Sequence, residues 1–266
     1  MTQRPLISLE NVTITFGGLV AVANVSMFVE PGELVGLIGP NGAGKTTVFN
    51  LITGVYRPTS GAIKFADKND PNHMIDLVGK KPYTVTARGI ARTFQNIRLF
   101  NEMTVLDNVR LALSHSFRYG LLASLTHLGK FHAEEERSIE EARRLLDVFD
   151  LRDKQDELAR NLPYGEQRRL EIARAMATDP RLLLLDEPAA GMNPIETEAL
   201  AETIARIRKE FGITILLIEH DMSLVMKICE RIYVLDHGQL IAHGTPDQIQ
   251  HNERVIEAYL GDDDDI

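Results

Sequence analysis

A glycine-rich run at residues 39–46 limits this chain to a narrow set of folds. It reads GPNGAGKT and matches the pattern G-x-x-x-x-G-K-[ST] at every fixed position. The run follows Leu34–Ile38, an apolar stretch with the length of a buried strand, and it precedes residues 45–53, which have the pattern of a helix. In this order the loop and the helix N-terminus form an anion site of backbone N–H groups. Residues 39–46 are therefore predicted to be a phosphate loop.

Two side chains of the phosphate loop have expected roles of their own. Lys45 is expected to reach the β- and γ-phosphates of a nucleotide, and the Thr46 hydroxyl to ligate Mg²⁺. Thr47 is either a second phosphate contact or only a hydroxyl at the helix N-terminus. Glycines let the backbone approach phosphate oxygens without an intervening Cβ. The residues expected to bind the nucleotide here are Gly39, Pro40, Asn41, Gly42, Ala43, Gly44, Lys45, Thr46 and Thr47.

A second motif, at residues 181–188, reads RLLLLDEP, an apolar strand that ends in two carboxylates. In a parallel sheet the carboxyl ends of the strands face the ligand crevice. Asp186 is expected to hold Mg²⁺, directly or through water. Glu187 is expected to orient and polarise the attacking water as a general base. Because this motif accompanies a phosphate loop, the two together predict hydrolysis of a nucleoside triphosphate.

The hydrophobic pattern changes along the chain. Residues 7–16 and 22–29 alternate apolar and polar side chains, as half-buried strands do. Helical periodicity dominates from residue 104 to about 158 and is strongest at 133–149, whereas 114–132 is expected to be a long loop between helices. The last third alternates helices and strands, which implies a parallel sheet. Its expected elements are helices at 162–177, 195–211 and 223–230, strands at 181–186 and 213–219, and a hairpin turning at His237-Gly238.

Composition excludes several other classes of protein. The 266 residues include a single cysteine, Cys229, so an intrachain disulfide framework is ruled out. No apolar run approaches the roughly 18 residues that a membrane span needs. The N-terminus lacks the long apolar stretch of a secretory signal, so we expect the chain to act in the cytoplasm. The net charge is −9, and four of the negative charges lie at 262–265 in a tail expected to be disordered; this acidic balance disfavours nucleic acid.

The motifs together resemble those of the ATP-binding-cassette (ABC) ATPases. Gln95, in ARTFQN at 91–96, matches the glutamine that senses the γ-phosphate in this family, and His220, in LIEHD at 217–221, matches its switch histidine. The segment LPYGE at 162–166 stands where the family has its signature LSGGQ, and AAGMNP at 189–194 occupies its D-loop. Phe16 lies where the family places an aromatic ring on adenine. The resemblance spans residues 6–261.

This resemblance implies an α/β fold with a P-loop NTPase core, an antiparallel β subdomain and a helical subdomain. It implies one ABC ATPase domain at 6–261, with the core at 6–97 and 161–261 and the helical subdomain at about 98–160. ATP and Mg²⁺ are the implied substrate and cofactor. Glu187, His220 and Gln95 are the implied catalytic residues. Other implied ligand contacts are Gln95 on Mg²⁺, Phe16 on adenine, and Tyr164, Gly165 and Glu166 on the ATP held by a second ATPase subunit.

Two positions depart from the family pattern. Pro163 replaces the signature serine, which removes a hydroxyl and an N–H group, so we expect weakened but not abolished closure on ATP. Asn193 replaces the D-loop aspartate, which keeps hydrogen-bonding capacity without the charge. Either change could make one of the two ATP sites in a dimer the weaker one.

Within the family, several stretches are similar to the ATPases of branched-chain amino-acid importers, namely 89–96, 165–173, 186–194 and 258–261. This similarity implies a second ATPase subunit (the same or a different chain), two membrane permeases that dock near 97–102, and an external solute-binding protein. It places the chain on the cytoplasmic face of the inner membrane. Urea or amide import and lipopolysaccharide export remain alternatives. A soluble ABC protein of DNA repair or translation is disfavoured by the single cassette, and a nucleotide-gated subunit without turnover is disfavoured by Glu187.

Overall fold

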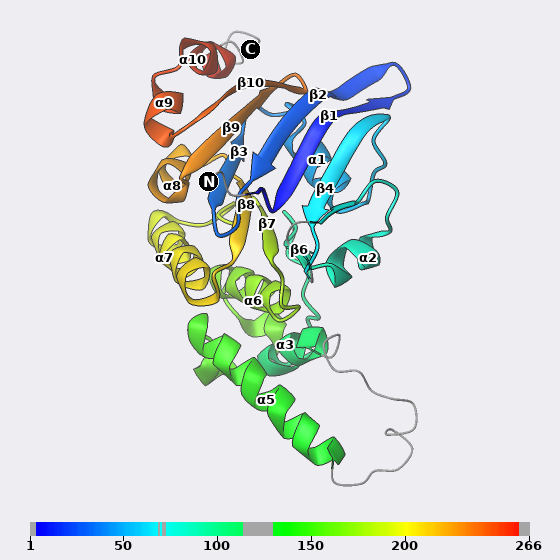
Figure 1. Cartoon of the computed structure of the whole chain (residues 1–266). Helices are drawn as coiled ribbons and strands as arrows, with labels where there is room; N and C mark the ends of the chain where they lie inside the picture. The colour runs from blue at the N-terminus through cyan, green and yellow to red at the C-terminus, as the bar shows by residue number, and fades with distance from the viewer. Residues whose placement is uncertain (1–3, 69, 71–72, 114–129, 261–266) are drawn as a thin grey trace.

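A computed structural model describes residues 4–68, 70, 73–113 and 130–260 (Figure 1). Its centre is a six-stranded sheet in the order β10-β9-β3-β8-β7-β6. The strands from β9 to β6 run parallel to their neighbours, and β10 pairs antiparallel with β9 through a turn at His237-Gly238, as predicted. The strands are β3 (Leu34–Ile38), β6 (Ile90–Arg92), β7 (Leu182–Asp186), β8 (Thr214–Ile218), β9 (Arg231–Asp236) and β10 (Gln239–Gly244).

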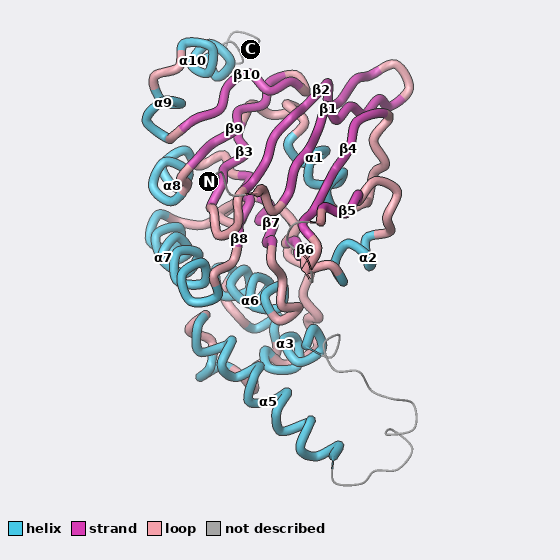
Figure 2. The backbone as a smooth tube through the Cα atoms, viewed as in Figure 1, coloured by secondary structure: helices cyan, strands magenta, loops and turns pink. Residues whose placement is uncertain are grey.

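The three middle strands are buried along their whole length, which explains their uninterrupted apolar sequences. Successive residues of each strand pack into two different cores: Leu183 and Leu185 on one face of β7, Leu182 and Leu184 on the other. The first core is covered by helices α6, α7 and α8, and the second by α1 and an antiparallel sheet (Figure 2). These helices are α1 (Lys45–Ile52), α6 (Tyr164–Met176), α7 (Pro194–Phe211) and α8 (Met222–Ile228).

The antiparallel sheet has the order β2-β1-β4-β5. It comprises β1 (Ile7–Phe16), β2 (Leu19–Val29), β4 (Ser60–Ala66) and β5 (Met74–Asp76). The buried positions of β1 alternate with partly exposed ones at Ile7 to Leu9 and again at Val12 to Ile14, which matches the half-buried pattern of the sequence.

Helices α3 (Val105–Leu113) and α5 (Lys130–Val148) pack against α6 at one end of the molecule (Figure 1). Two short 3₁₀ turns, Arg152–Lys154 and Ala159–Asn161, lead from α5 to α6. The remaining helices are α2 (Pro82–Ala87), α9 (Pro246–Gln250) and α10 (Glu253–Leu260).

The predicted fold class is confirmed, with some differences in detail. Most of the loop expected at 114–132 lies outside the described residues, as does the acidic tail, but α5 begins at Lys130 instead of residue 133. Within α3, Val109 and Leu113 are buried, whereas Leu111 is 45% exposed. Cys229 is buried, and it follows α8 as the C-cap, because the helix predicted at 223–230 ends at Ile228. Burial raises the pKa of its thiol to about 12.

Candidate functional site

The predicted motifs meet where three neighbouring parallel strands end. β3 leads into the phosphate loop, β7 ends at Asp186, and β8 leads to His220. Because β8 lies between β3 and β7, these three strand ends are adjacent along one edge of the sheet. The parallel arrangement therefore brings the phosphate loop beside Asp186 and His220, which lie more than one hundred residues after it in the sequence.

The phosphate loop presents backbone donors. Gly39 and Gly44 have φ of +148° and +99°. A Cβ on Gly39 would lie 1.9 Å from the Leu235 carbonyl oxygen, and a Cβ on Gly44 would lie 2.7 Å from the Ala21 carbonyl oxygen, so both positions need glycine. Helix α1 has no side-chain N-cap and no acidic residue in its first turn. Within the described chain, the backbone N–H groups of residues 45–47 donate no hydrogen bond to another backbone group. The helix N-terminus therefore retains free donors and a positive partial charge, which suit the phosphates of a nucleotide.

The side chain of Lys45 lies inside this loop. Its Nζ donates hydrogen bonds of 2.6 and 2.8 Å to the carbonyl oxygens of Gly39 and Pro40. Burial lowers the pKa of the ammonium group, while the charges of Glu187 and Asp186 act in the opposite direction. The ammonium group thus faces both the loop and the carboxylates at the end of β7.

Three residues predicted to be catalytic form one hydrogen-bonded group. Gln95 Nε2 donates to Glu187 Oε2 at 2.8 Å, and His220 Nε2 lies 2.8 Å from Glu187 Oε1. Each carboxylate oxygen thus has one partner and keeps a lone pair for a further proton. Glu187 itself has φ of +48°, a strained backbone conformation for a non-glycine residue. The carboxylate is therefore oriented from both sides at an edge that solvent can reach.

Asp186 has a partner that the sequence analysis did not identify. Its Oδ2 accepts a hydrogen bond of 2.7 Å from Arg92 Nη2, and both side chains are buried. Its backbone N–H donates to Thr93 Oγ1 at 3.3 Å. A charged residue at the end of the short, otherwise apolar strand β6 was the only signal in the sequence that could have pointed to this pair.

Glu219 is a second residue that the sequence analysis left without a role. Its buried carboxylate accepts hydrogen bonds from the N–H groups of Ala189 (2.6 Å), His220 (3.0 Å) and Asp221 (3.4 Å). Burial raises the pKa of this carboxyl group, and the three N–H groups oppose the shift. Glu219 therefore joins the start of the D-loop to the backbone that carries the switch histidine.

Arg168 is a third such residue, and it is fully buried in α6. Its guanidinium donates to the carbonyl oxygens of Phe94 (2.6 Å) and Gln95 (2.7 Å) and to the carboxylate of Glu171 (2.8 Å). A longer bond of 3.3 Å reaches the Tyr164 hydroxyl. Burial raises the pKa of Glu171, which the charge of Arg168 counteracts. Arg168 thus fastens the backbone of Gln95 to the helix that begins in the signature segment.

The signature segment, residues 162–166, stands apart from the phosphate loop. Tyr164 is 43% exposed, and the N-cap Pro163 supplies no side-chain hydrogen bond to α6. The Glu166 carboxylate pairs with Lys154 at 2.6 Å within the same chain. In the described residues, no hydrogen bond joins this segment to residues 39–46.

Two further predicted positions have local partners. Asn193 is the N-cap of α7: its Oδ1 accepts from the N–H groups of Ile195 and Glu196, both at 3.0 Å, in a capping box with Glu196. Phe16 is 43% exposed and packs edge-on against Tyr56, with ring centroids 5.1 Å apart. Its contact with adenine stays a prediction.

The residues around the phosphate loop suit Mg²⁺ better than a metal held only by protein ligands. Among the described residues, no three His, Cys, Asp or Glu side chains are grouped as a metal site. Mg²⁺ is commonly held by one or two carboxylates together with phosphate oxygens and water. Oδ1 of Asp186 has no hydrogen-bond donor in the described chain, so this oxygen is available as a ligand.

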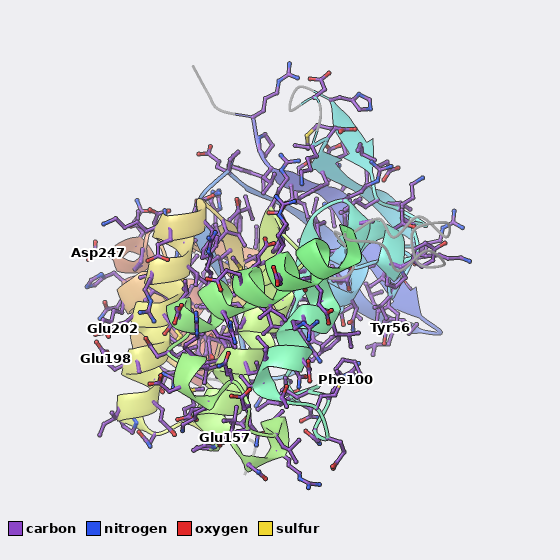
Figure 3. All side chains as sticks on the ribbon, turned by 90° about the horizontal axis from the view of Figure 1, so that it is seen from below. Tyr56, Phe100, Glu157, Glu198, Glu202 and Asp247 are labelled. Carbon is purple, nitrogen blue, oxygen red and sulfur yellow. The ribbon has the colours of Figure 1, made fainter. Side chains whose placement is uncertain are left out.

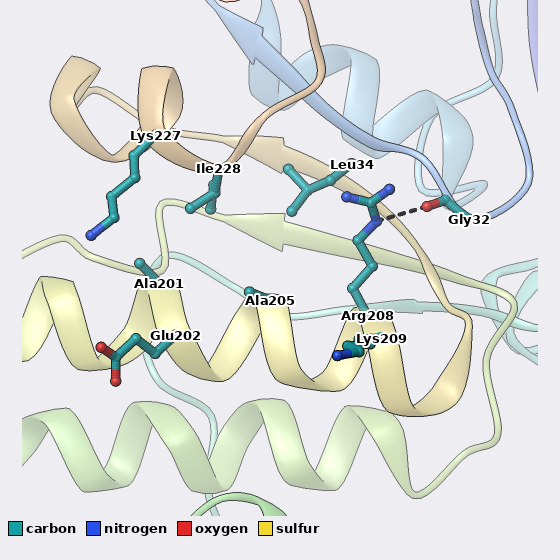
Figure 4. A pocket seen from close by; sticks show the side chains of 9 residues that line it. All are labelled: Gly32, Leu34, Ala201, Glu202, Ala205, Arg208, Lys209, Lys227 and Ile228. Carbon is teal, nitrogen blue, oxygen red and sulfur yellow. Dashed lines mark hydrogen bonds between the residues drawn. The ribbon is translucent and has the colours of Figure 1, made fainter.

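Several hollows of the described residues lie outside this edge of the sheet. One, of about 410 Å³, is lined by apolar side chains that include Phe94, Phe100 and Leu111, together with Arg174. Figure 3 places Phe100 on the same side of the molecule as Tyr56, opposite the carboxylates of α7. Another, of about 560 Å³, lies between α7, α8 and the start of β3, where Arg208 Nε donates to the Gly32 carbonyl oxygen at 2.7 Å (Figure 4). In the described residues no helix is long and apolar enough to cross a membrane.

Comparison with known families and relatives gives consistent matches over the whole chain. Residues 22–190 match a family model described as ABC transporter, and residues 239–265 match one described as branched-chain amino acid ATP-binding cassette transporter. The chain is 48% identical over 260 residues to the high-affinity branched-chain amino acid transport ATP-binding protein LivG of Escherichia coli (strain K12), covering 98% of this chain and 99% of that protein. The lipopolysaccharide export system ATP-binding protein LptB of the same strain is 35% identical over 255 residues, covering 96% of each.

Solved structures with the same fold include ATP-binding cassettes. The ADP conformation of MJ1267, an ATP-binding cassette of an ABC transporter, has a TM-score of 0.82 and 32% identity and covers 97% of this chain and 100% of that one. A dimeric post-hydrolysis state of the cassette MJ0796, bound to ADP and Pi, has a TM-score of 0.73 and 26% identity and covers 90% and 98% of the two chains.

Proposed function

The chain belongs to the ABC transporter family and is one of its ATPases, and from this premise we propose that it powers the import of branched-chain amino acids. The observation that carries the proposal is the part of the chain over which it is similar to branched-chain amino-acid transporters. It includes residues 239–265, which contain β10, α9 and α10 and lie outside the nucleotide motifs. The identity to LivG is also higher than that to the lipopolysaccharide export protein LptB. Import of branched-chain amino acids is thus favoured over the export alternative.

The described geometry supports a division of labour in nucleotide binding. The free N–H groups of the phosphate loop and the Lys45 ammonium bind the phosphates. Thr46 and Asp186, with Gln95 as a further ligand, hold Mg²⁺. When bound, Mg²⁺ would neutralise negative charge that develops on the transferred phosphoryl group. Phe16, which is exposed beside Tyr56, stacks on the adenine.

Glu187 acts as the general base. Gln95 and His220 fix its carboxylate through separate oxygens, so the remaining lone pairs point in a defined direction. A water held there gives its proton to the carboxylate as its oxygen attacks the γ-phosphorus, and the β–γ bridging bond breaks to leave ADP and phosphate. His220 donates to the carboxylate when its Nε2 carries the proton, and this bond orients Glu187 before the reaction begins.

The signature segment serves the nucleotide held by a second ATPase subunit. Tyr164, Gly165 and Glu166 lie at the uncapped start of α6, a position that suits anions, and they have no bond to the loop of their own chain. Lys154 neutralises the Glu166 carboxylate, which would otherwise repel phosphate. The dimeric relative MJ0796 is consistent with such pairing, whether the second subunit is the same chain or a different one.

Two membrane permeases complete the transporter, with an external solute-binding protein delivering the solute. The apolar hollow near Phe100, beside residues 97–102, suits an amphipathic helix of a permease. This arrangement places the chain at the cytoplasmic face of the inner membrane without a spanning helix of its own. Residues 6–97 and 161–261 form the nucleotide core, and about 98–160 form the helical subdomain that meets the permeases.

Reconstitution tests this proposal. The chain is co-purified with its permease partners and placed in proteoliposomes with the binding protein, ATP and radiolabelled solutes. We expect ATP-dependent uptake of leucine, isoleucine and valine, and little uptake of urea. ATP-dependent transport of urea, or of lipopolysaccharide, without leucine uptake would overturn the substrate assignment but not the ATPase assignment.

A further inference from the structure

Arg92 joins three parts of the nucleotide site. It is the last residue of β6, immediately before the segment that carries Gln95. Its Nη2 donates to Asp186 Oδ2 and its Nη1 to Asn50 Oδ1 of α1, each at 2.7 Å. The side chains of Arg92 and Asp186 are only 7% and 4% exposed. The ion pair is therefore shielded from water and from salt.

The guanidinium of Arg92 is also held by aromatic rings. Its Cζ lies 5.5 Å from the ring centroid of Phe49 and 5.2 Å from that of Phe94. Nε has no hydrogen-bond partner, so the group's recorded hydrogen bonds all run through its two terminal nitrogens. A planar fork held in this way has a fixed direction for each N–H bond, which a lysine ammonium could not reproduce.

We propose that Arg92 is the positioning residue of the Mg²⁺ site, and that it sets the distance between the two ligands Thr46 and Asp186. This inference rests on the proposed function, in which both residues hold the ion. Asn50 lies one helical turn after Thr46, on the same face of α1. Because Arg92 donates hydrogen bonds to both Asn50 and Asp186, it links helix α1, which carries Thr46, to strand β7, which carries Asp186. It engages one oxygen of Asp186 and leaves Oδ1 available.

Loss of Arg92 would leave a buried carboxylate in need of another partner. Lys45 of the phosphate loop, held by hydrogen bonds to the Gly39 and Pro40 carbonyl oxygens and influenced by the charge of Asp186, is an alternative partner. A carboxylate that pairs with Lys45 must break this contact to bind the metal, so metal affinity falls. A purely electrostatic role predicts the opposite result, because removing a positive charge beside the site would strengthen cation binding. The sign of the change therefore separates positioning from simple repulsion.

The test measures Mn²⁺ as a substitute for Mg²⁺ by electron paramagnetic resonance on the purified full chain with a non-hydrolysable ATP analogue. For Arg92→Met we expect Mn²⁺ affinity to fall by about 10- to 100-fold, the usual effect of removing a group that orients a metal ligand. Arg92→Lys should give a smaller loss. Affinity for the analogue in EDTA should change far less. Mn²⁺ affinity that is unchanged or higher in a folded Arg92→Met variant overturns the proposal.

Three further variants keep this result interpretable. Arg181→Met is the matched control, since Arg181 also faces an aromatic ring, Phe65, and donates to a carbonyl oxygen, but it lies away from the site. If Arg92→Met does not fold, Asn50→Ala removes only the second anchor of Arg92 and should still lower the Mn²⁺ affinity. An unchanged Mn²⁺ affinity in Asn50→Ala would overturn the proposal. Asp186→Asn tests the proposed metal site itself, which is wrong if this variant keeps its Mn²⁺ affinity. If Asp186→Asn loses Mn²⁺ affinity while the Arg92 variants keep theirs, only the role of Arg92 is refuted.

Discussion

The edge of the parallel sheet and the signature segment are built in contrasting ways. At the sheet edge, Lys45, Asp186 and Glu187 each have charged or polar partners within 3 Å in the same chain. At the signature segment, Tyr164 is exposed and the start of α6 has no side-chain cap. A site that fixes its own side chains can work on a nucleotide bound to the same chain. An uncapped helix start beside an exposed Tyr164 is consistent with the proposal that the signature segment serves a nucleotide held by a second chain.

Arg168 is the main physical link between these two regions, so its loss should have the largest effect. We expect Arg168→Met to lower the free energy of unfolding by about 3–5 kcal/mol, because it removes the ion-pair partner of the buried Glu171 carboxylate and leaves it only backbone N–H donors such as that of Arg98. Urea denaturation measures the change. The double variant Arg168→Met, Glu171→Leu should recover much of the loss, and a double variant that is no more stable than the single one would contradict the importance of the pair.

Glu187 tests the sheet edge itself. Glu187→Gln keeps the shape of the side chain but removes the base, so the rate of ATP hydrolysis should fall at least about 100-fold. Nucleotide affinity, measured with a fluorescent ATP analogue, should stay close to that of the unmodified chain because Lys45 and the loop are untouched. Hydrolysis that persists near its original rate would show that another group accepts the proton.

Asn193 lies between the two regions, and its effect should be structural. Asn193→Ala removes the N-cap of α7 and should cost about 1 kcal/mol in the free energy of unfolding. Asn193→Asp keeps the cap and adds a charge that favours a helix N-terminus, so its stability should match or exceed that of the original chain. Equal destabilisation by both substitutions would rule out the capping explanation.

Asp221 gives the smallest effect and one that depends on pH. The Ser223 hydroxyl bond, with the N–H groups of residues 223 and 224, holds the pKa of this carboxyl below its usual value. Its contribution is therefore complete above the unfolded-state pKa of about 3.9 and is lost as the pH falls through the lower folded-state pKa. At pH 7, Asp221→Ala should cost about 0.5 kcal/mol, since the group is partly solvated. Urea midpoints of the two chains should converge below pH 4, and a constant difference would contradict the assignment.

The sequence predicted those parts of the fold and site that are coded locally. The run Leu182–Leu185 is apolar throughout because both faces of β7 are buried, and the phosphate loop is recognisable because its glycines and Lys45 are contiguous. Strand β6 and helix α2 were not predicted, since three and six residues are too few for a clear period.

The partners of the charged residues could not be predicted either. Arg92 and Asp186 are 94 positions apart, and Arg168 and the Gln95 carbonyl oxygen 73. The pairs exist only because the parallel sheet brings β6 beside β7 and because α6 packs against β6. A buried arginine looks like a surface one in a sequence, so only the fold reveals its function.

The division of the site between two chains is tested most directly by light scattering on Glu187→Gln with ATP, with and without Gly165→Asp. An aspartate in the first turn favours the helix and repels phosphate, but its Cβ would lie 3.2 Å from Glu196 Oε1, so circular dichroism must show that the variant folds. We predict that ATP doubles the mass of the Glu187→Gln chain, and that adding Gly165→Asp abolishes the doubling while leaving the ATP affinity of the single chain unchanged. If Gly165→Asp weakens ATP binding by the single chain, or leaves the doubling intact, the signature segment does not act on a nucleotide held by another chain.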